Sequence, residues 1–285
     1  MFFMSATKAK IWVLIILGVF TALIWYAVLT THRGNLRVSF LNIGQGDAIF
    51  IESPTGNQML IDAGPNAKVL RELGKVMPFY DHSIDIALAT HPDKDHIGGF
   101  ADVLNLYNVN TFLEDGNESE TNIDDTMEAI ADQKGVRRII AERGMVIDLG
   151  GGAKIFILYP IGNVEGWETN RASIIAKLVY GNTSFMLTGD SPQEIEKYLV
   201  GLDGEKLDSD VLKAGHHGSR TSTSVEFVSA VTPTMAIISA GKDNSYGHPH
   251  KETIETLQAA HAEILSTAEM GTITLESDGQ AIVRK

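Results

Sequence analysis

The stretch Thr90–Gly99 constrains this chain more than any other, because it places two imidazoles and two carboxylates within six residues. The apolar segment before it, at 84–90, is typical of a buried strand. Imidazole nitrogen together with carboxylate oxygen suits zinc, manganese or iron, whereas calcium and magnesium prefer oxygen alone. Two neighbouring aspartates without a cation would repel each other. We therefore predict a metal site at this loop, formed by His91, Asp93, Asp95 and His96.

Composition limits the classes of protein to which the chain can belong. It has 285 residues, 44% of them hydrophobic, which is ample for one large globular domain. It has no cysteine, which excludes a disulfide framework, a thiolate ligand and a thiol nucleophile. The net charge of −13 argues against a broadly basic surface that coats nucleic acid. A nuclease with a local basic rim stays open, because metal ions supply positive charge at the site itself.

An uncharged apolar run of 19 residues at Ile11–Leu29 predicts a membrane-spanning helix, since about 20 residues cross a hydrocarbon core of roughly 30 Å. Lys8 and Lys10 precede the run, and His32, Arg33 and Arg37 follow it. When the charge of the amino terminus is counted as well, the bias toward an amino terminus in the cytoplasm is slight. A cleaved signal peptide and a buried core helix are the alternatives. We predict a single-pass membrane anchor at 1–33 and a catalytic body at 34–285, outside the cytoplasm. No further spanning segment follows, so we expect channel partner proteins if DNA is to be transported.

Beyond the apolar run, strand and helix patterns occur in two successive sets. Strands are predicted at 36–41, 48–53, 58–61, 84–90, within 137–160, at 173–180, 184–187, 210–214 and 235–240, and near residues 264, 273 and 282. Helices are predicted at 67–77, 99–106, 123–133, 192–200, 224–231 and 251–260. Each set carries ligand-type residues at strand ends, which predicts an α/β (α+β) fold with two sheets face to face and helices outside.

Seven blocks in this order resemble the metallo-β-lactamase superfamily, and more closely the hydrolase domain of ComEC-type DNA-uptake competence proteins. The blocks are Phe40–Ala48, Ile61–Gly64, Thr90–Gly99, Asn170–Ser173, Leu187–Asp190, Leu212–Ser219 and Asn244–Pro249. The resemblance covers nearly everything beyond the anchor. It implies a four-layer αββα sandwich with one or two divalent metal ions, zinc or manganese, at one edge of the sheets.

The resemblance also implies a metal-ligand set. Its members are His91 and Asp93 for the first position, Asp95 and His96 for the second, Asp190 as the bridging carboxylate, and His216. Asp62 would orient a ligand. Two departures matter: Asp93 stands where many members carry histidine, and Asn170 lies about where a third histidine of the first position is often found. The first position is therefore richer in oxygen, which favours manganese over strict zinc.

The sequence leaves open which of His216, His217 and His248 is the last metal ligand. The spacing from Asp190 to His216 matches several relatives, whereas the spacing to His248 matches some phosphodiesterase branches. We take His216 as the ligand and His217 or His248 as the proton donor. A purely structural role for His217 is the alternative, since one of two adjacent histidines is often structural.

The expected chemistry is metal-assisted hydrolysis, in which a cation lowers the pKa of its water from about 15.7 to about 7. Asp95 or Asp190 would hold the attacking group in line, and an imidazole would protonate the departing oxygen. Three residues beside the site would contact a phosphodiester substrate, DNA first among them: Lys213, Ser219 and Arg220. A small ester, lactone or lactam is the alternative substrate. A third possibility is an anchored binding module whose metal is structural or lost.

Overall fold

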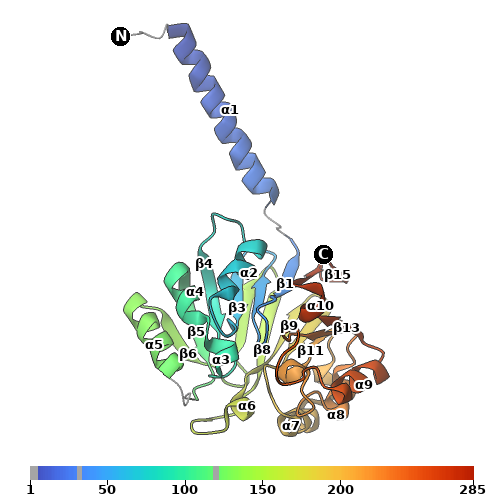
Figure 1. Cartoon of the computed structure of the whole chain (residues 1–285). Helices are drawn as coiled ribbons and strands as arrows, with labels where there is room; N and C mark the ends of the chain where they lie inside the picture. Colours follow the sequence, from blue (N-terminus) through green and yellow to red (C-terminus); the bar gives the residue numbers. More distant parts are fainter. Residues whose placement is uncertain (1–5, 31–33, 118–121) are drawn as a thin grey trace. The chain divides into compact units, whose positions relative to one another are not determined.

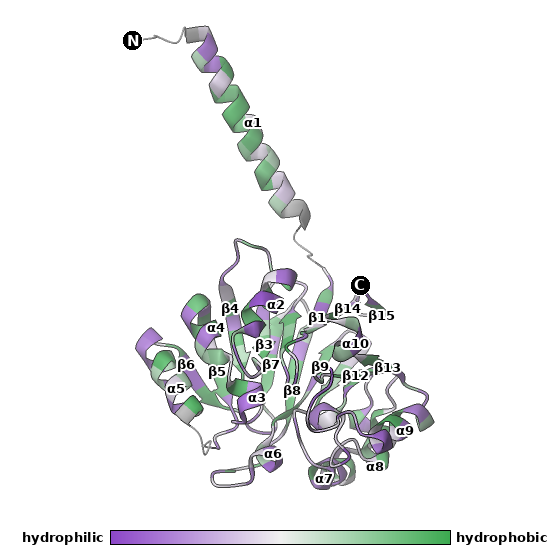
Figure 2. Cartoon of the chain, viewed as in Figure 1, coloured by the Kyte–Doolittle hydropathy of each residue, from purple (hydrophilic) through white to green (hydrophobic). Residues whose placement is uncertain are grey.

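The computed structural model describes residues 6–30, 34–117 and 122–285, which fall into two units, 1–33 and 34–285. The first unit contains helix α1 (Ala6–Thr30), whose apolar character runs along most of its length (Figure 2). Its segment Thr7–Ala27 is long and apolar enough to cross a membrane, a statement about length and composition alone. His32 and Arg33, which entered the charge count of the sequence analysis, lie outside the described residues.

The first sheet of the second unit has eight strands in the order β15-β14-β1-β2-β3-β4-β5-β6. Their bounds are β1 (Leu36–Phe40), β2 (Ile49–Glu52), β3 (Gln58–Ile61), β4 (Ser83–Leu88), β5 (Asn108–Glu114), β6 (Arg137–Ile140), β14 (Ile273–Ser277) and β15 (Ile282–Arg284). Pairing is antiparallel from β15 to β3 and parallel from β3 to β6. Strands β3 to β6 therefore present their carboxyl ends at one edge.

The second sheet has seven strands in the order β13-β12-β11-β10-β9-β8-β7. Their bounds are β7 (Val146–Gly150), β8 (Ala153–Tyr159), β9 (Ile175–Tyr180), β10 (Thr183–Leu187), β11 (Val211–Lys213), β12 (Met235–Ile238) and β13 (Glu263–Ser266). Pairing is antiparallel from β7 to β10 and parallel from β10 to β13. Each sheet thus combines an antiparallel part with a parallel part.

Helices cover the outer face of both sheets, which gives the predicted four-layer αββα sandwich (Figure 1). The first sheet packs against α2 (Lys68–Val76), α4 (Phe100–Leu106) and α5 (Asn122–Lys134). The second packs against α7 (Gln193–Asp203), α8 (Val225–Val231) and α9 (Lys251–Ala259). Short helices complete the chain: α3 (Lys94–Ile97), α6 (Thr169–Ala172), α10 (Thr267–Met270), η1 (Gly204–Leu207) and η2 (Gly215–Gly218).

Two features of the fold differ from the sequence prediction. Strand β5 was not predicted; its first half, Asn-Val-Asn-Thr, has two asparagines, which are depleted in strands, and its place between β4 and β6 makes it a strand. The strands were expected in two successive sets, but β14 and β15 return to the first sheet, where β14 pairs along the whole of β1. That pairing satisfies the backbone groups of β1 on a side that would otherwise be an open edge.

Gly98 and Gly99 allow the metal loop to lie directly on the segment after β3. A Cβ atom at Gly99 would stand 2.2 Å from the carbonyl oxygen of Ala63, and one at Gly98 would stand 2.4 Å from that of Pro65. The amide of Gly99 donates to the carbonyl of Gly64 across 2.9 Å. Only glycine permits this backbone contact, which holds the loops after β3 and β4 together at the site.

Candidate metal centre

Polar side chains that follow strands of the first sheet and of the second sheet, which we call the two halves of the body, meet at the edge where the parallel strands end. Asp62 follows β3, the loop of His91 follows β4, Asp190 follows β10 and His217 follows β11. Carboxyl ends of neighbouring parallel strands meet at one edge, so residues far apart in the sequence become neighbours.

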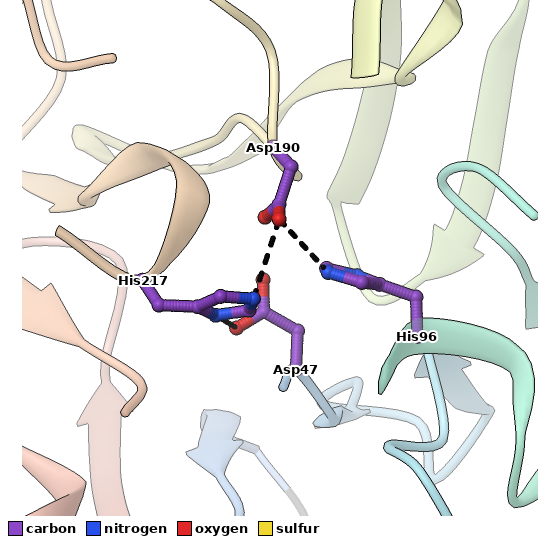
Figure 3. Close-up of side chains that lie close together, drawn as sticks. All are labelled: Asp47, His96, Asp190 and His217. Atoms are coloured by element: carbon purple, nitrogen blue, oxygen red, sulfur yellow. Dashed lines mark ion pairs between the residues drawn. The ribbon is translucent and has the colours of Figure 1, made fainter. Parts of the chain in front are cut away.

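The carboxylate of Asp190 is the point on which imidazoles converge. Its Oδ2 lies 3.3 Å from Nε2 of His96, 3.2 Å from Nε2 of His217 and 3.7 Å from Nε2 of His216. His96 comes from α3 of the first half, whereas the other two come from η2 of the second (Figure 3 shows Asp190, His96 and His217). The centre therefore exists only when the two halves are packed together.

The opposite edge of each buried imidazole is held by a fixed acceptor. Nδ1 of His96 donates to Oδ2 of Asp62 across 2.7 Å, and Asp62 also accepts from the amide and hydroxyl of Thr90. Nδ1 of His217 donates to the carbonyl of Ser239 across 3.0 Å. With Nδ1 protonated, the lone pair of each Nε2 points toward Asp190, which is how protein imidazoles are oriented for a cation.

Charge coupling at the centre is strong. Burial lowers the pKa of His96, but the carboxylates of Asp190 and Asp62 outweigh it and hold that pKa well above its usual value. Burial likewise lowers the pKa of His217, which Asp190 and Asp47 raise well above the usual value. Without a cation, protons on these imidazoles therefore compensate the buried carboxylates. A divalent cation and these protons compete for the same lone pairs.

The donor set fits a divalent metal ion. Several buried atoms have no hydrogen-bond partner among the described residues, and four of them belong to residues that the sequence predicts at the metal site: His91 Nε2, His96 Nε2, Asn170 Oδ1 and Asp190 Oδ1. A buried polar atom without a partner costs about 1–3 kcal/mol, so a cluster of four indicates a missing ligand. Nitrogen and oxygen donors together suit zinc or manganese. One ligand atom from each of Asp47, His96, Asp190 and His217 lies within 4.8 Å of the others.

A second group of donors lies beside the first. Nε2 of His91 is 3.6 Å from Oδ2 of Asp93, and the ring of His91 is centred 4.1 Å from that of His96. Thr169 of α6 contacts Asp93. The next residue, Asn170, has a buried Oδ1 without a hydrogen-bond partner in the described chain. His91 therefore lies beside Asp93, and Asn170 belongs to α6, the helix whose Thr169 contacts Asp93.

The geometry favours His217 over His216 as the last ligand. The side chain of His217 is 1% exposed, against 28% for His216, and its Nε2 is closer to Asp190. Both residues have left-handed backbone angles, with φ of 48° and 55°. Such conformations are uncommon for residues other than glycine and are concentrated at functional sites. This local backbone turns His217 inward, which spacing along the chain could not reveal.

Lys213 does not lie where the sequence analysis placed it. Its side chain is buried and forms an ion pair with Asp47, so it cannot contact a substrate from this position. Burial raises the pKa of Asp47, but Lys213 and His217 outweigh it and lower that pKa. Nδ1 of His217 lies 3.5 Å from Oδ1 of Asp47, so Asp47 sits on the Nδ1 side of the ring, away from Asp190. We therefore interpret Asp47 as orienting His217.

Asp47 is the site residue that the sequence analysis missed as a functional group. The available signal was its place at the end of the glycine-containing turn 42–47, between two strands and inside one of the seven blocks. The turn was interpreted as a simple reversal. In the fold, the amide of Asp47 donates to the carbonyl of Asp95 across 3.2 Å, which brings the turn against the metal loop.

Of the remaining predicted residues, Asp95, Arg220 and His248 are at least partly exposed, whereas Ser219 is buried. Asp95 Oδ2 is 3.1 Å from Nε2 of His217, and the side chain of Asp95 is 34% exposed. Ser219 is buried and its hydroxyl pairs with Thr221, whereas Arg220 is exposed. Burial and neighbouring imidazoles lower the pKa of His248 to about 4. His248 is therefore neutral at pH 7, which does not favour the expected role of proton donor.

Comparison with known proteins agrees with this geometry. The sequence signature of the Metallo-beta-lactamase superfamily matches residues 41–242. The chain belongs to this superfamily. Among solved structures, the metallo-beta-lactamase fold protein YhfI from Bacillus subtilis has a TM-score of 0.58 at 13% identity, over 85% of this chain and 100% of its own. Zn(2+)-bound PqqB from Methylobacterium extorquens has a TM-score of 0.51 at 13% identity, over 81% and 87% of the two chains. At these identities the likeness concerns the fold.

Curated relatives indicate to which members of the superfamily the chain is similar. The chain is 32% identical over 254 residues to ComE operon protein 3 of Bacillus subtilis (strain 168), covering 83% of this chain and 32% of the relative. It is 26% identical over 260 residues to Competence protein ComA of Neisseria gonorrhoeae, covering 90% and 34%. The chain thus spans about a third of the length of these relatives. Family, fold and donor cluster together support a metal-dependent hydrolase of the superfamily.

The competition between cation and proton makes metal binding depend on pH. Since the pKa values of His96 and His217 are raised, both rings stay protonated through neutral pH until a cation displaces the protons. We expect manganese affinity to rise between about pH 6 and about pH 8, by roughly tenfold per pH unit for each proton displaced. Titration calorimetry in two buffers of different ionisation enthalpy measures affinity and proton release together. Affinity that is independent of pH would contradict this account.

The pair of Lys213 and Asp47 offers a test by double substitution. Lys213→Met leaves the buried carboxylate without its cation, and we expect it to lower the free energy of unfolding of the metal-free protein by about 3–5 kcal/mol. Adding Asp47→Asn removes the uncompensated charge and should restore most of that loss. Urea unfolding measures the free energy of unfolding of both variants and of the wild type. Wild-type stability of Lys213→Met would show that Lys213 does not compensate Asp47.

Proposed function

We propose that the protein is a metal-dependent phosphodiesterase that acts on DNA. The observation that carries the proposal is the convergence of His96, His217 and His216 on Asp190, beside the partly exposed Asp95. Imidazole and carboxylate groups are thus held together at an edge of the sheets that is partly open to solvent. A closed structural site would have no reason to keep Asp95 exposed, because such sites complete their coordination with protein groups alone.

The residues of the site would form two groups of metal ligands. His96, Asp190 and His217 would hold one cation, with Asp95 beside them; His91, Asp93 and Asn170 would hold a second. A bound divalent cation supplies Lewis acidity, which polarises a phosphoryl oxygen and lowers the pKa of a water molecule.

Asp95 is our candidate for the group that moves a proton. Burial raises its pKa, but His217 and His96 outweigh that effect and hold it below the usual value, so its carboxylate is ionised at neutral pH. Its Oδ2 is 3.1 Å from Nε2 of His217, and its partial exposure leaves it accessible to a water molecule and a substrate. We assign Asp95 the role of orienting the attacking water and accepting its proton.

The substrate class rests on the relatives and on charge. The two curated relatives described above are named as a competence protein and as a ComE operon protein, which motivates DNA as the substrate. A polyanion would be repelled by a chain of net charge −13 unless metal ions supply local positive charge. Exposed Arg220 and Lys242, in loops beside the histidines, add to that charge. A small ester or lactone is the alternative, and the assay below distinguishes it.

We further propose that α1 anchors the body to the cell membrane, with residues 34–285 outside the cytoplasm. The 21-residue apolar segment of α1 supports the anchor, and the slight cationic bias at the amino terminus supports the orientation. We expect protease added to intact spheroplasts to digest the body while a cytoplasmic marker survives. Protection of the body until the membrane is broken would contradict this orientation, and recovery of the full chain in the soluble fraction would contradict the anchor.

The assignment of Asp95 can be tested with a matched pair of variants. We expect Asp95→Asn to lower kcat/KM on single-stranded DNA and on bis(p-nitrophenyl) phosphate by about 10³-fold, because the proton acceptor is lost. Asp125→Asn, an exposed carboxylate on α5, is the control that should retain activity. Thermal unfolding checks that both variants are folded. Activity retained by Asp95→Asn would reject its role.

The substrate class is tested with the wild-type protein after its metal content has been measured. Manganese-dependent cleavage of both phosphodiesters supports the proposal. With metal bound, cleavage of neither phosphodiester overturns it, and hydrolysis of p-nitrophenyl acetate or a lactone in their place would establish the alternative.

A further inference from the structure

An exposed aromatic ring stands next to the metal centre and has no role in the chemistry described so far. Tyr246 is 65% exposed, and its ring stacks on that of His248, with centroids 5.7 Å apart and planes 22° apart. The ring of His248 is in turn centred 5.6 Å from that of His216, which reaches Asp190. A row of three rings therefore leads from the metal centre to solvent.

The loop that carries Tyr246 is held in shape mainly by the amide side chain of Asn244, and Gln45 adds contacts to Gly241 and His248. Oδ1 of Asn244 accepts from the amides of Tyr246 and His248 across 3.2 and 3.0 Å. Its Nδ2 donates to the carbonyls of Gly241 and His248 across 2.9 and 2.6 Å. The stacked pair is thus presented on a fixed loop, so a ligand that stacks on it does not have to order the loop.

A hollow and two cationic side chains adjoin the stacked pair. His248 and Lys242 border the hollow, of about 540 Å³, which Asp243 and Glu269 also line, so the hollow itself is not positively charged. Arg220 is exposed on the neighbouring loop, and its amide donates to Nδ1 of His250 across 3.1 Å, which ties the two loops together. Cations beside an exposed aromatic face are the combination that single-stranded nucleic acids use: phosphates meet the charges and bases stack on the rings.

We propose that Tyr246 and His248 form a stacking shelf for an unpaired nucleobase, beside the phosphodiester that is cut. This inference rests on the proposed phosphodiesterase function and adds a substrate preference to it. Bases within a duplex stack on each other and offer no free face, so a shelf at this place selects single-stranded nucleic acid. The preference then comes from the exposed aromatic ring rather than from the metal ligands.

The experiment measures binding, so that it does not depend on cleavage. Fluorescence anisotropy gives the Kd of a labelled phosphorothioate oligothymidylate and of its abasic counterpart, each with manganese present. We expect the wild type to bind the oligothymidylate about tenfold more tightly than the abasic strand. Tyr246→Ala should lose that ratio, and Tyr246→Trp should keep it. Tyr198→Ala, at a tyrosine on α7 that is 52% exposed, is the matched control and should keep the wild-type ratio.

Each outcome has one meaning. An unchanged ratio in Tyr246→Ala, or equal binding of base-bearing and abasic strands by the wild type, overturns the shelf even if phosphodiesters are cleaved. Loss of the ratio in both Tyr246→Ala and Tyr198→Ala also overturns it, because the effect would not be specific to this ring. Failure of the metal-bound wild type to cleave either single-stranded DNA or bis(p-nitrophenyl) phosphate overturns the proposed function, whereas the shelf is then decided by the binding ratio alone.

Discussion

The buried carboxylate of Asp190 requires positive charge from both halves of the body, and the rest of the site depends on this requirement. Its oxygen lies within 3.3 Å of imidazole nitrogens from α3 and from η2. A carboxylate buried without such partners would cost several kcal/mol. Packing the two sheets together therefore also assembles the charge balance of the centre. A divalent cation can take over the part that imidazole protons play without it, so that one arrangement serves both stability and metal binding.

The surroundings of the two buried imidazoles follow the same plan in each half. In the first half, Asp62 fixes His96 and is itself held by Thr90. In the second, a backbone carbonyl and Asp47 stand behind His217, and Lys213 balances the charge of Asp47. Outer groups of this kind fix the ring orientation and the protonated nitrogen, which decides the direction of each free lone pair. Asp47 and Lys213 thus belong to the support of the centre rather than to its contact with substrate.

Rigid ligands and substrate contacts come from different parts of the fold. Asp190, His96 and His217 follow the ends of buried strands and are themselves buried, which keeps their positions fixed. Asp95, on the short helix α3, and His248 are partly exposed, and Tyr246, on the same loop as His248, is exposed. Loops carried by a rigid scaffold are where substrate preference is ordinarily set. The proposed reaction and the proposed preference for unpaired bases can therefore be separated by substitution.

The sequence alone determined the features that depend on short range: the metal loop with its two histidines, most strands and helices, the glycine pair after the loop and the family. Each follows from local periodicity or from donors a few residues apart. Only the tertiary structure decided that His217 turns inward, because two consecutive left-handed residues have no reliable signature in their side chains. It also decided that Asp47 meets Lys213, since 166 residues separate them and no local pattern links the two. Packing brings distant groups within reach, and burial then fixes which of them must be paired.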